Sequence, residues 1–290
     1  NMSNPVAFAN IMYDKLIYKC TNYEHSIGGT NSDVKKFTKK DFMDFYKKHY
    51  IPSNCVLSVC GRIIKDVDKL IIKYFSKNIK SITDECNINY DLMSMQKSLR
   101  FKSIIKPIQQ ANIYMGYPCY ADKNNKKKIC TLDIISTALG GNMSSRLFIK
   151  LREEQGLVYT VSCSQETTYD VGTFTIYFGT FNNKIKKATT LILKEIEKIK
   201  KKGLDKKELK RTVDYIIGIN QLSSEDNETY NTDIAWEYLY FNKITELKEY
   251  EKIYKSIKNE DIINVAKEIF NNTKLNYCVL ANKKIKCFIK

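Results

Sequence analysis

The chain has 290 residues, of which 43% are hydrophobic and 28% are charged, and its formal net charge at pH 7 is +16. This length exceeds that of one ordinary domain, and the composition excludes a mostly disordered chain. Four prolines and eleven glycines exclude collagen-like and mucin-like sequences, and two histidines exclude most self-contained zinc enzymes.

The positive charge is compatible with a solvated basic surface or with a specific anionic partner. Lysine, asparagine and isoleucine are abundant together, as in residues 124–128, which is typical of an AT-rich genome and favours the solvated surface. Nine cysteines are too few for a disulfide scaffold and include no C-x-x-C pair, so the sequence predicts a reducing, intracellular compartment. No apolar stretch reaches the roughly 18–20 residues that a membrane helix needs, which predicts a soluble protein.

The first 75 residues predict three helices and one strand. Apolar residues at helical spacing predict helices over about 1–22 and 66–75. A further helix over 38–49 begins at a threonine that can cap it. The apolar run 55–60 is too short for a helix and predicts a buried strand in which Cys55 packs as a small hydrophobic residue.

Residues 76–98 lose this periodicity and gather asparagine, aspartate, serine and lysine, which predicts a connection between domains. The elements that follow have the mixture of strands and helices that is typical of an α/β domain. We expect strands at 110–118, 158–164, 172–181 and 276–281, and helices at 127–139, at 144–154 and in succession through 184–271. Cys278, in the last strand, is expected to be buried.

A helix–turn–strand pattern occurs twice, about 220 residues apart. Residues 37–57 and 257–280 each contain an amphipathic helix with an aspartate near its start, Asp41 or Asp261, and an apolar run after a short turn. Chance similarity between two such units is one reading, and two copies of one α/β domain is the other. In the second reading the first copy would begin before Asn1, so we expect a missing or separate start.

A family resemblance rests on residues in the middle of the chain. The runs LGGNMSSRLF at 139–148 and LREEQGLVYTV at 151–161 resemble the second half of the M16 (pitrilysin/insulinase) metallopeptidases, especially the branch similar to mitochondrial processing peptidase. The runs HSIGG at 25–29 and FYKKHY at 45–50 resemble the late part of the first domain in that family.

The resemblance implies two homologous α/β domains, each an α+β sandwich, that face each other around a chamber. It divides this chain into the C-terminal part of a first domain at 1–80, a linker at 81–98 and a complete second domain at 99–290.

The resemblance also implies zinc chemistry. In the family, an inverted His-x-x-Glu-His motif and a more distant glutamate bind zinc, and the motif glutamate takes a proton from the zinc-bound water. His25 and His49 are 24 residues apart and have no partner at this spacing, so we assign no metal ligand in this chain. We expect zinc in the complete enzyme, bound by a missing or separate N-terminal segment, and none bound by this chain, which alone is predicted to be inactive.

Two residues match a pattern that contacts substrate in the family. Arg152 and Tyr159 have the R-x6-Y spacing, and the resemblance implies that they reach the substrate and the zinc-bound oxygen. A guanidinium can donate to a peptide carbonyl, and a phenol can stabilise an oxyanion. The alternative is a surface arginine that pairs with Glu153 or Glu154, together with a tyrosine packed in the sheet.

Gly140, Gly141 and Asn142 resemble the glycine-bearing loop through which relatives of processing peptidase touch substrate. The alternative, which the shortness of the loop favours, is the end of one helix followed by the N-cap of the next.

Three functions follow. The first hypothesis is the C-terminal portion of an M16-like zinc endopeptidase, which closes the chamber and binds a peptide substrate. The second is a non-catalytic M16-like scaffold or binding subunit. A third, a polyanion-binding protein, is least favoured because lysine outnumbers arginine and no nucleic-acid motif is present. The expected partners are a peptide substrate and an N-terminal zinc-bearing segment or partner subunit, and a dimer is compatible with this arrangement.

Overall fold

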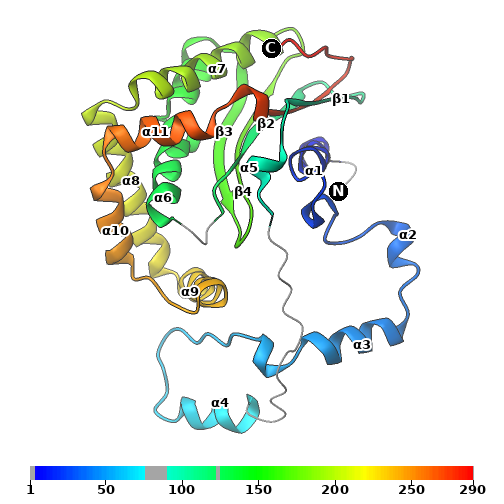
Figure 1. Ribbon diagram of the computed structural model, residues 1–290, viewed down its shortest axis with the longest axis vertical. Helices are drawn as coiled ribbons and strands as arrows, with labels where there is room; N and C mark the ends of the chain where they lie inside the picture. The colour runs from blue at the N-terminus through cyan, green and yellow to red at the C-terminus, as the bar shows by residue number, and fades with distance from the viewer. Residues whose placement is uncertain (1–3, 76–89, 122–124, 290) are drawn as a thin grey trace. The chain divides into compact units, whose positions relative to one another are not determined.

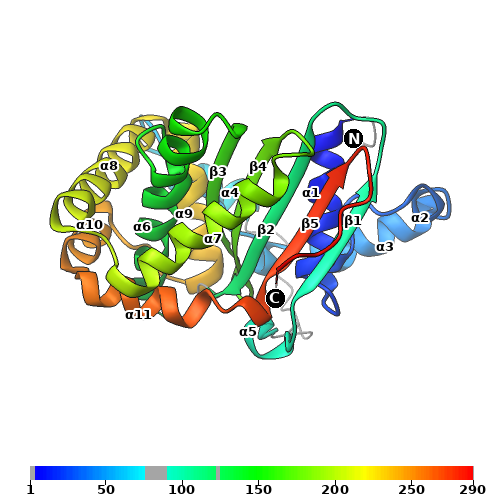
Figure 2. The ribbon, with the colours of Figure 1, turned by 90° about the horizontal axis from the view of Figure 1, so that it is seen from above.

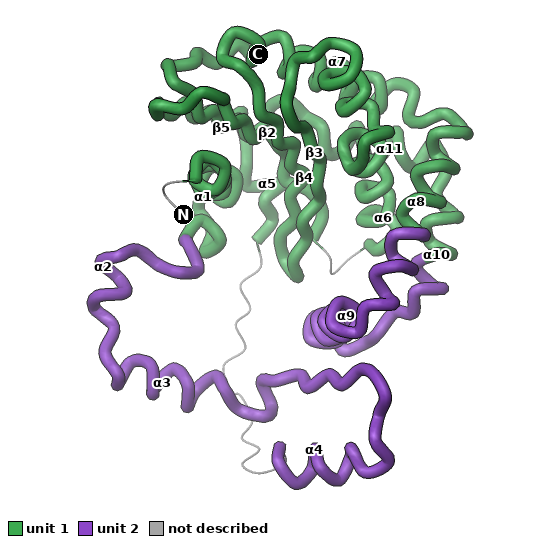
Figure 3. Tube along the Cα trace, turned by 180° about the vertical axis from the view of Figure 1, so that it is seen from behind, with its two compact units in different colours: residues 1–25, 90–217, 251–290 green, residues 26–89, 218–250 purple. Residues whose placement is uncertain are grey.

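The computed structural model describes residues 4–75, 90–121 and 125–289, which divide into two compact units (Figures 1 and 3). Unit 1 comprises residues 1–25, 90–217 and 251–290, and unit 2 comprises residues 26–89 and 218–250. These units group segments by contact, whereas the predicted boundaries at 1–80, 81–98 and 99–290 concern a repeated domain. The boundaries therefore stay a prediction, and half of the predicted linker lies outside the described residues.

Unit 1 is built on a mixed sheet with the strand order β1-β5-β2-β4-β3. The strands are β1 (Arg100–Ile105), β2 (Ala111–Cys119), β3 (Val158–Thr167), β4 (Gly172–Thr180) and β5 (Asn276–Ala281). β1 and β5 are parallel, and the other neighbouring pairs are antiparallel. β2, β4 and β5 are the most buried strands, and β3 forms one edge of the sheet.

Helices cover the two faces of this sheet unequally (Figure 2). One face carries α6 (Lys126–Ser136), α7 (Ile185–Lys202) and α11 (Asn259–Ile269), and the other carries α1 (Pro5–Ile17). Alternate residues of each strand point to opposite faces. On β4, Phe174 packs edge-to-face on Phe270 just after α11, whereas Thr175 hydrogen-bonds to α1. The face covered by α6, α7 and α11 therefore holds the main apolar core, and the face covered by α1 is more polar.

The short helix α1 docks on the sheet from far away in the sequence. Its N-terminus is capped by Asn4, and Pro5 takes the first helical position, where its missing N–H costs no hydrogen bond. The apolar side of α1 packs on the middle strands of the sheet. The buried residues of α1 and of the strands that it contacts form one cluster, which consists of Phe8, Ala9, Tyr13, Ile17, Tyr114, Cys278 and Leu280. Burial of these residues, rather than the intrinsic stability of a 13-residue helix, holds α1 in place.

Unit 2 has few interior residues. It contains α2 (Asn31–Val34), α3 (Lys39–His49), α4 (Val67–Phe75) and α9 (Asn227–Phe241), and none of these helices includes a buried residue. The helix α8 (Lys206–Glu225) runs from unit 1 into unit 2, and α10 (Leu247–Ser256) returns to unit 1. Inside unit 2, Ser58 Oγ donates a hydrogen bond to Asn231 Oδ1 at 2.5 Å. Unit 2 is thus held by polar contacts and shallow packing more than by a core.

The repeated pattern is present as repeated local structure. α3 and α11 both have eleven residues and are offset by 220 positions, as are the 3₁₀ turns Pro52–Asn54 and Asn272–Lys274. The residues that end the two helices, Tyr50 and Phe270, have nearly the same conformation, with φ and ψ of −91° and 66° and of −84° and 69°. The pattern therefore specifies a defined helix–turn unit at both places.

The buried strand predicted at 55–60 is wrong for this structure. Within the described residues this segment pairs with no strand, and Cys55 is exposed. Strand geometry needs a neighbouring backbone to accept its hydrogen bonds, and unit 2 offers none among the residues that the structure describes. Cys278, at a similar place in the second copy of the pattern, is fully buried in β5, as expected.

The other predicted elements of unit 1 are found with shifts of a few residues, and the α/β fold class is confirmed. The strand β1 and the four-residue helix α5 (Leu92–Met95) were not predicted. None of the helices in the described ranges is long and apolar enough to cross a membrane. None of the eight cysteines in these ranges forms a disulfide bond with another described residue.

Candidate functional site

Arg152 and Tyr159 lie on either side of a tight turn that leads into the edge strand. Arg152 is near the end of the π-helical segment η4 (Phe148–Glu154), and Tyr159 is the second residue of β3. The Arg152 carbonyl accepts a hydrogen bond from the amide of Gly156 at 3.2 Å. Gly156 has a φ of +53°, which a glycine adopts without steric cost.

Two lysines at the start of α7 hold this turn. Lys184 Nζ donates to the Gly156 carbonyl at 2.8 Å, and Lys187 Nζ donates to Gln155 Oε1 at 3.0 Å. The backbone amide of Leu157 donates to the Leu151 carbonyl at 2.7 Å. The turn between the two candidate residues is therefore fixed by side-chain and backbone contacts.

The guanidinium of Arg152 lies over an aromatic ring. Its Cζ is 5.0 Å from the centre of the Phe148 ring, one helical turn earlier. Glu154 pairs instead with Lys150 at 2.6 Å, and Arg152 forms no ion pair with a residue that the structure describes. Stacking on a ring leaves the edge of the guanidinium, which carries the N–H donors, open to a ligand.

Tyr159 occupies a β-bulge. Val158 pairs with Thr180 and Thr160 pairs with Gly179, so Tyr159 is an extra residue on β3 without a partner on β4. Bulges re-aim side chains and are frequent beside active sites. The Tyr159 side chain is 49% exposed, its ring packs edge-to-face on Phe181 at 5.1 Å, and its hydroxyl bonds to no described residue. Packing against Phe181 therefore orients the Tyr159 ring, and the Tyr159 hydroxyl is accessible to a ligand.

The loop at 140–142 has a clear structural role. It ends the π-helical segment η3 (Thr137–Gly141), and a Cβ on Gly140 would lie 2.5 Å from Cys163 Sγ on β3. Asn142 Oδ1 accepts from the Ser144 amide at 2.9 Å, and this bond starts the next helical segment. The geometry supplies the helix stop and cap that the sequence offered as the alternative, and a substrate role for this loop stays a prediction.

The loop at 140–142 and the turn between Arg152 and Tyr159 both lie beside β3. η3 and η4 both pack on this strand, and Tyr159 and Cys163 are four positions apart along it. Phe148 was not predicted as part of the site, although an aromatic residue four positions before an arginine on a helix is a recognisable signal.

The described residues do not fit a zinc site. No group of three or more histidine, cysteine, aspartate or glutamate side chains comes together in the described ranges. His25 is exposed in its loop, and the His49 ring packs on Phe45 with centroids 4.4 Å apart at the end of α3. No chemical step is therefore assigned to a metal held by these residues.

Comparison with known proteins identifies similar chains. The family model described as the peptidase M16 inactive domain matches residues 36–215. An uncharacterized zinc protease of Rickettsia felis is 30% identical over 268 residues, which are 91% of this chain and 63% of that protein. A non-peptidase homolog of Helicobacter pylori, YmxG, is 28% identical over 189 residues, 63% of this chain and 42% of that protein.

One solved structure supports the fold as a whole. The crystal structure of a peptidase M16 inactive domain from Pseudomonas fluorescens matches with a TM-score of 0.86 and 17% identity, over 98% of this chain and 67% of that one. The chain thus spans about 63% of the Rickettsia relative and has a fold seen in a longer solved chain.

Proposed function

The chain belongs to the peptidase M16 family, and on this premise we propose that it forms the C-terminal portion of an M16-like zinc endopeptidase. In this proposal it closes the chamber and binds the peptide substrate, while an N-terminal segment or a partner subunit supplies the zinc ligands.

The contrast between the two copies of the repeat carries the proposal. The residues that face the core in α11 are buried, whereas their counterparts 220 positions earlier in α3 are exposed. Ile262 is 0% exposed and its counterpart Phe42 is 64% exposed. Phe270 and its counterpart Tyr50 differ in the same way, with 1% and 64%. A helix that presents this much apolar surface is typical of a domain that lacks part of its packing.

The same contrast extends to the segment after the helix. β5 lies in the middle of a sheet, between β1 and β2, whereas residues 55–60 pair with no strand that the structure describes. A complementary segment with a sheet would bury α3 as the sheet of unit 1 buries α11. This supports the view that residues 1–80, which include α3, are part of a first domain that another segment completes.

Arg152 and Tyr159 supply the substrate contacts in this proposal. The stacked guanidinium of Arg152 would donate to a carbonyl of the bound peptide, which fixes the position of the backbone. The Tyr159 hydroxyl would donate to the oxygen on which negative charge develops as the peptide carbonyl is attacked. Their fixed turn pre-orders both donors, so little entropy is lost when substrate binds.

Reconstitution tests the proposal. The chain is combined with an M16 N-terminal segment that carries His-x-x-Glu-His, and peptide cleavage is measured with and without a chelator. We expect chelator-sensitive cleavage by the combination and none by this chain alone. Cleavage by this chain alone, blocked by the chelator, contradicts the proposal.

Two variants of the reconstituted enzyme test the site residues. We expect Tyr159→Phe to lower kcat about a hundredfold or more, because one oxyanion donor is lost. We expect Arg152→Lys to lower kcat/KM about tenfold or more, because a planar fork is replaced by a point charge. Tyr169→Phe is the matched control, since Tyr169 is 47% exposed just beyond the other end of β3. Equal kcat in Tyr159→Phe and the control would reject the role of Tyr159.

A non-catalytic scaffold or binding subunit is the second candidate. The similarity to a non-peptidase homolog favours it. In that case the chain binds peptide or a partner subunit, no combination cleaves peptide, and the expected effect of Arg152→Lys is weaker peptide binding.

A further inference from the structure

A groove of about 510 Å³ lies between α7 and the last residues of the chain. One wall consists of α7 residues between Thr190 and Lys202, and the other wall consists of Asn272, Phe288 and Ile289. The last residues return along the face of the sheet that carries α7 (Figures 1 and 2). The groove therefore belongs to the face of unit 1 that α6, α7 and α11 cover.

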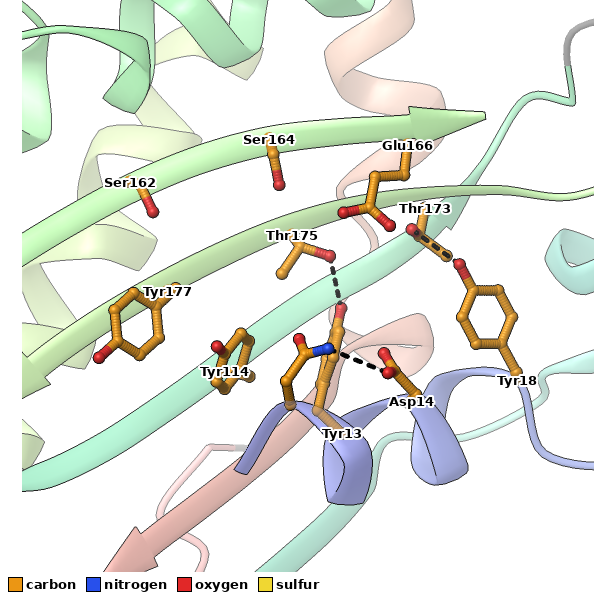
Figure 4. Close-up of a pocket in the computed structure, with 11 residues that line it drawn as sticks. Tyr13, Asp14, Tyr18, Tyr114, Ser162, Ser164, Glu166, Thr173, Thr175 and Tyr177 are labelled. Atoms are coloured by element: carbon orange, nitrogen blue, oxygen red, sulfur yellow. Dashed lines mark hydrogen bonds between the residues drawn. The ribbon is translucent and has the colours of Figure 1, made fainter. Parts of the chain in front are cut away.

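The groove is separate from the candidate substrate contacts and from the polar cavity beside α1. That cavity is lined by Asp14 and Glu166 and lies on the other face of the sheet (Figure 4). Neither Arg152 nor Tyr159 lines the groove, and all the residues that do line it belong to unit 1. Binding in the groove needs no zinc and can be measured without peptide cleavage.

The end of the chain is held on the sheet and supplies apolar surface to the groove. The Phe288 ring packs edge-to-face on Tyr277 of β5, with centroids 6.1 Å apart. The Ile285 amide donates a hydrogen bond to Ser103 Oγ of β1 at 3.0 Å. The apolar side chains that line the groove are half-buried and can bury more surface against a ligand; they are Leu193, Phe288 and Ile289.

The groove also carries lysines without acidic partners. Lys194, Lys201 and Lys202 line it, are exposed and form no ion pair with a residue that the structure describes. The other charged side chains of the groove are paired along α7, Lys198 with Glu195 and Glu197 with Lys200. Because four lysines and one glutamate line the groove, it has an excess of three positive charges.

The helix dipole explains only part of this charge. Lys201 and Lys202 are in the last turn of α7, where a positive charge stabilises the helix. Lys194 lies two turns earlier, and it is four positions before Lys198, a spacing at which like charges destabilise a helix. The groove therefore gathers more positive charge than α7 itself needs, and a bound anion would relieve the repulsion.

We propose that this groove binds a fatty acid, with the carboxylate among the unpaired lysines of α7 and the acyl chain against Phe288 and Ile289. The volume is within the range of about 300–1,000 Å³ that is typical of pockets for small molecules. A ligand with one apolar chain and one negative charge matches both the apolar surface and the excess positive charge.

A phosphate headgroup is less suited to this groove than a carboxylate. Phosphates favour the planar fork of arginine and the N-termini of helices. The described residues that line the groove include no arginine, and the lysines Lys201 and Lys202 lie at the C-terminus of α7, where the partial negative charge of the helix opposes a dianion.

Matched amphiphiles test the acyl chain and the charge in the 290-residue chain. Octanoate, decanoate and dodecanoate are titrated calorimetrically at pH 8, each below its micelle concentration. We expect decanoate to bind with a Kd of about 1 mM or tighter, and each added methylene to lower the Kd about two- to fourfold. Decanoyl-N-methylglucamide, which is neutral, and decyltrimethylammonium, which is a cation, should each bind at least about tenfold more weakly than decanoate.

Two further probes distinguish other anions. Decyl phosphate carries a phosphate headgroup on the same chain, and hexaglutamate stands for an acidic segment of a protein. We expect decyl phosphate to bind no more tightly than decanoate, and hexaglutamate not to displace decanoate. Tighter binding of decyl phosphate assigns the groove to a phosphate amphiphile, and displacement by hexaglutamate assigns it to an acidic protein. Either result overturns the proposal.

Lysine variants locate the bound carboxylate. We expect the triple variant Lys194→Gln, Lys201→Gln and Lys202→Gln to weaken binding of decanoate about tenfold, because each exposed pair contributes little and the three act together. The control has the same change of charge at three exposed lysines elsewhere in unit 1 and should keep its affinity; these lysines are Lys210, Lys252 and Lys267.

A variant of the apolar wall completes the test. We expect Phe288→Ser to weaken binding of decanoate about fivefold and to reduce the gain in affinity per methylene, whereas Phe288→Leu should retain both. Circular dichroism checks that each variant folds. The proposal is overturned if affinity does not depend on chain length, if the neutral amphiphile binds as tightly as decanoate, or if the two lysine triples have equal effects.

Discussion

At Gly140 the backbone of one element closely approaches another element. A Cβ there would lie 2.5 Å from Cys163 Sγ and 2.7 Å from the Cys163 backbone nitrogen, and the nitrogen cannot move without displacing β3. We expect Gly140→Ala to destabilise the chain by about 1–3 kcal/mol, the usual cost of overpacking. Urea unfolding followed by circular dichroism measures this change.

The control for this prediction is a second glycine of the same chain. Gly218, inside α8, has no heavy atom within 4 Å of the position that an added Cβ would take, and its φ lies outside the left-handed region. Gly218→Ala should therefore stabilise the chain by about 0.5–1 kcal/mol through helix propensity. If both variants shift the midpoint of urea unfolding in the same direction, the close approach at Gly140 does not cause the destabilisation in Gly140→Ala.

Asp14 makes stability depend on pH. Its pKa of about 6 in the folded chain exceeds the ordinary value of 3.8, so the folded state holds the proton more tightly than the unfolded state. This stabilisation is present below pH 4 and is lost as the pH rises through 6. The groups that face Asp14 are Glu166 of β3, Tyr18 beside α1, Tyr114 of β2 and Tyr177 of β4. Burial raises the pKa of each of these tyrosines, so they stay neutral in this range.

We expect Asp14→Asn to raise the Tm at pH 8 by about 2–4 °C and to leave it unchanged at pH 4. Asparagine cannot ionise, so the variant avoids the free-energy cost of ionising Asp14 in the folded chain. After solvent screening this cost is about 1 kcal/mol. Differential scanning fluorimetry at both pH values measures the shift. Asp214→Asn, at an exposed position of α8, is the control and should show no such difference.

Single residues were predictable only where their spacing is local. The seven-residue interval between Arg152 and Tyr159 can be read from the sequence, and both residues lie at the ends of elements, as expected. The bulge that turns Tyr159 outward could not be predicted, because it depends on the register between β3 and β4. The meeting of Asp14 with Glu166 joins positions 152 residues apart and has no local signal either.

Among the elements, the two copies of the helix–turn unit offer a matched comparison. Ile262 of α11 is fully buried, and Phe42, its counterpart in α3, is exposed. We expect Ile262→Ala to destabilise this chain by about 2–5 kcal/mol and Phe42→Ala by less than about 0.5 kcal/mol. Chemical unfolding of both variants measures the difference. Equal losses would show that α3 has a core of its own, which removes the main support for a complementary segment.

The two copies also differ in which elements could be predicted from the sequence. Helices with local caps form in both copies: Thr38 and Asp41 satisfy each other's backbone amides in α3, as they do in any capping box. The strand predicted at 55–60 was wrong because a strand depends on a neighbouring strand, and β1 was missed because its parallel partner β5 lies 176 positions later. Local interactions were therefore predictable, and pairing between distant segments was not.

At the scale of the whole molecule, the two units should differ in stability against local opening. β2, β4 and β5 are buried along nearly their full length, whereas α3 and α4 include no buried residue. Amides exchange with solvent through local opening, and its free energy follows the buried contacts of each segment. We expect amides of α3 and α4 to exchange at least about a hundredfold faster than those of β5 and α11.

Hydrogen exchange with mass spectrometry measures this difference and also tests what completes the predicted first domain. The helices α3 and α11 have the same length and both begin with an aspartate that accepts from the N-cap amide, so we expect their different packing to decide their protection. When the zinc-motif segment is added, exchange in α3 should slow towards the rate of α11, while β5 stays unchanged. Protection of α3 equal to that of α11 in this chain alone contradicts the incomplete-domain proposal. Slow exchange that the added segment leaves unaltered would favour the second candidate, a subunit that functions without a metal-bearing partner.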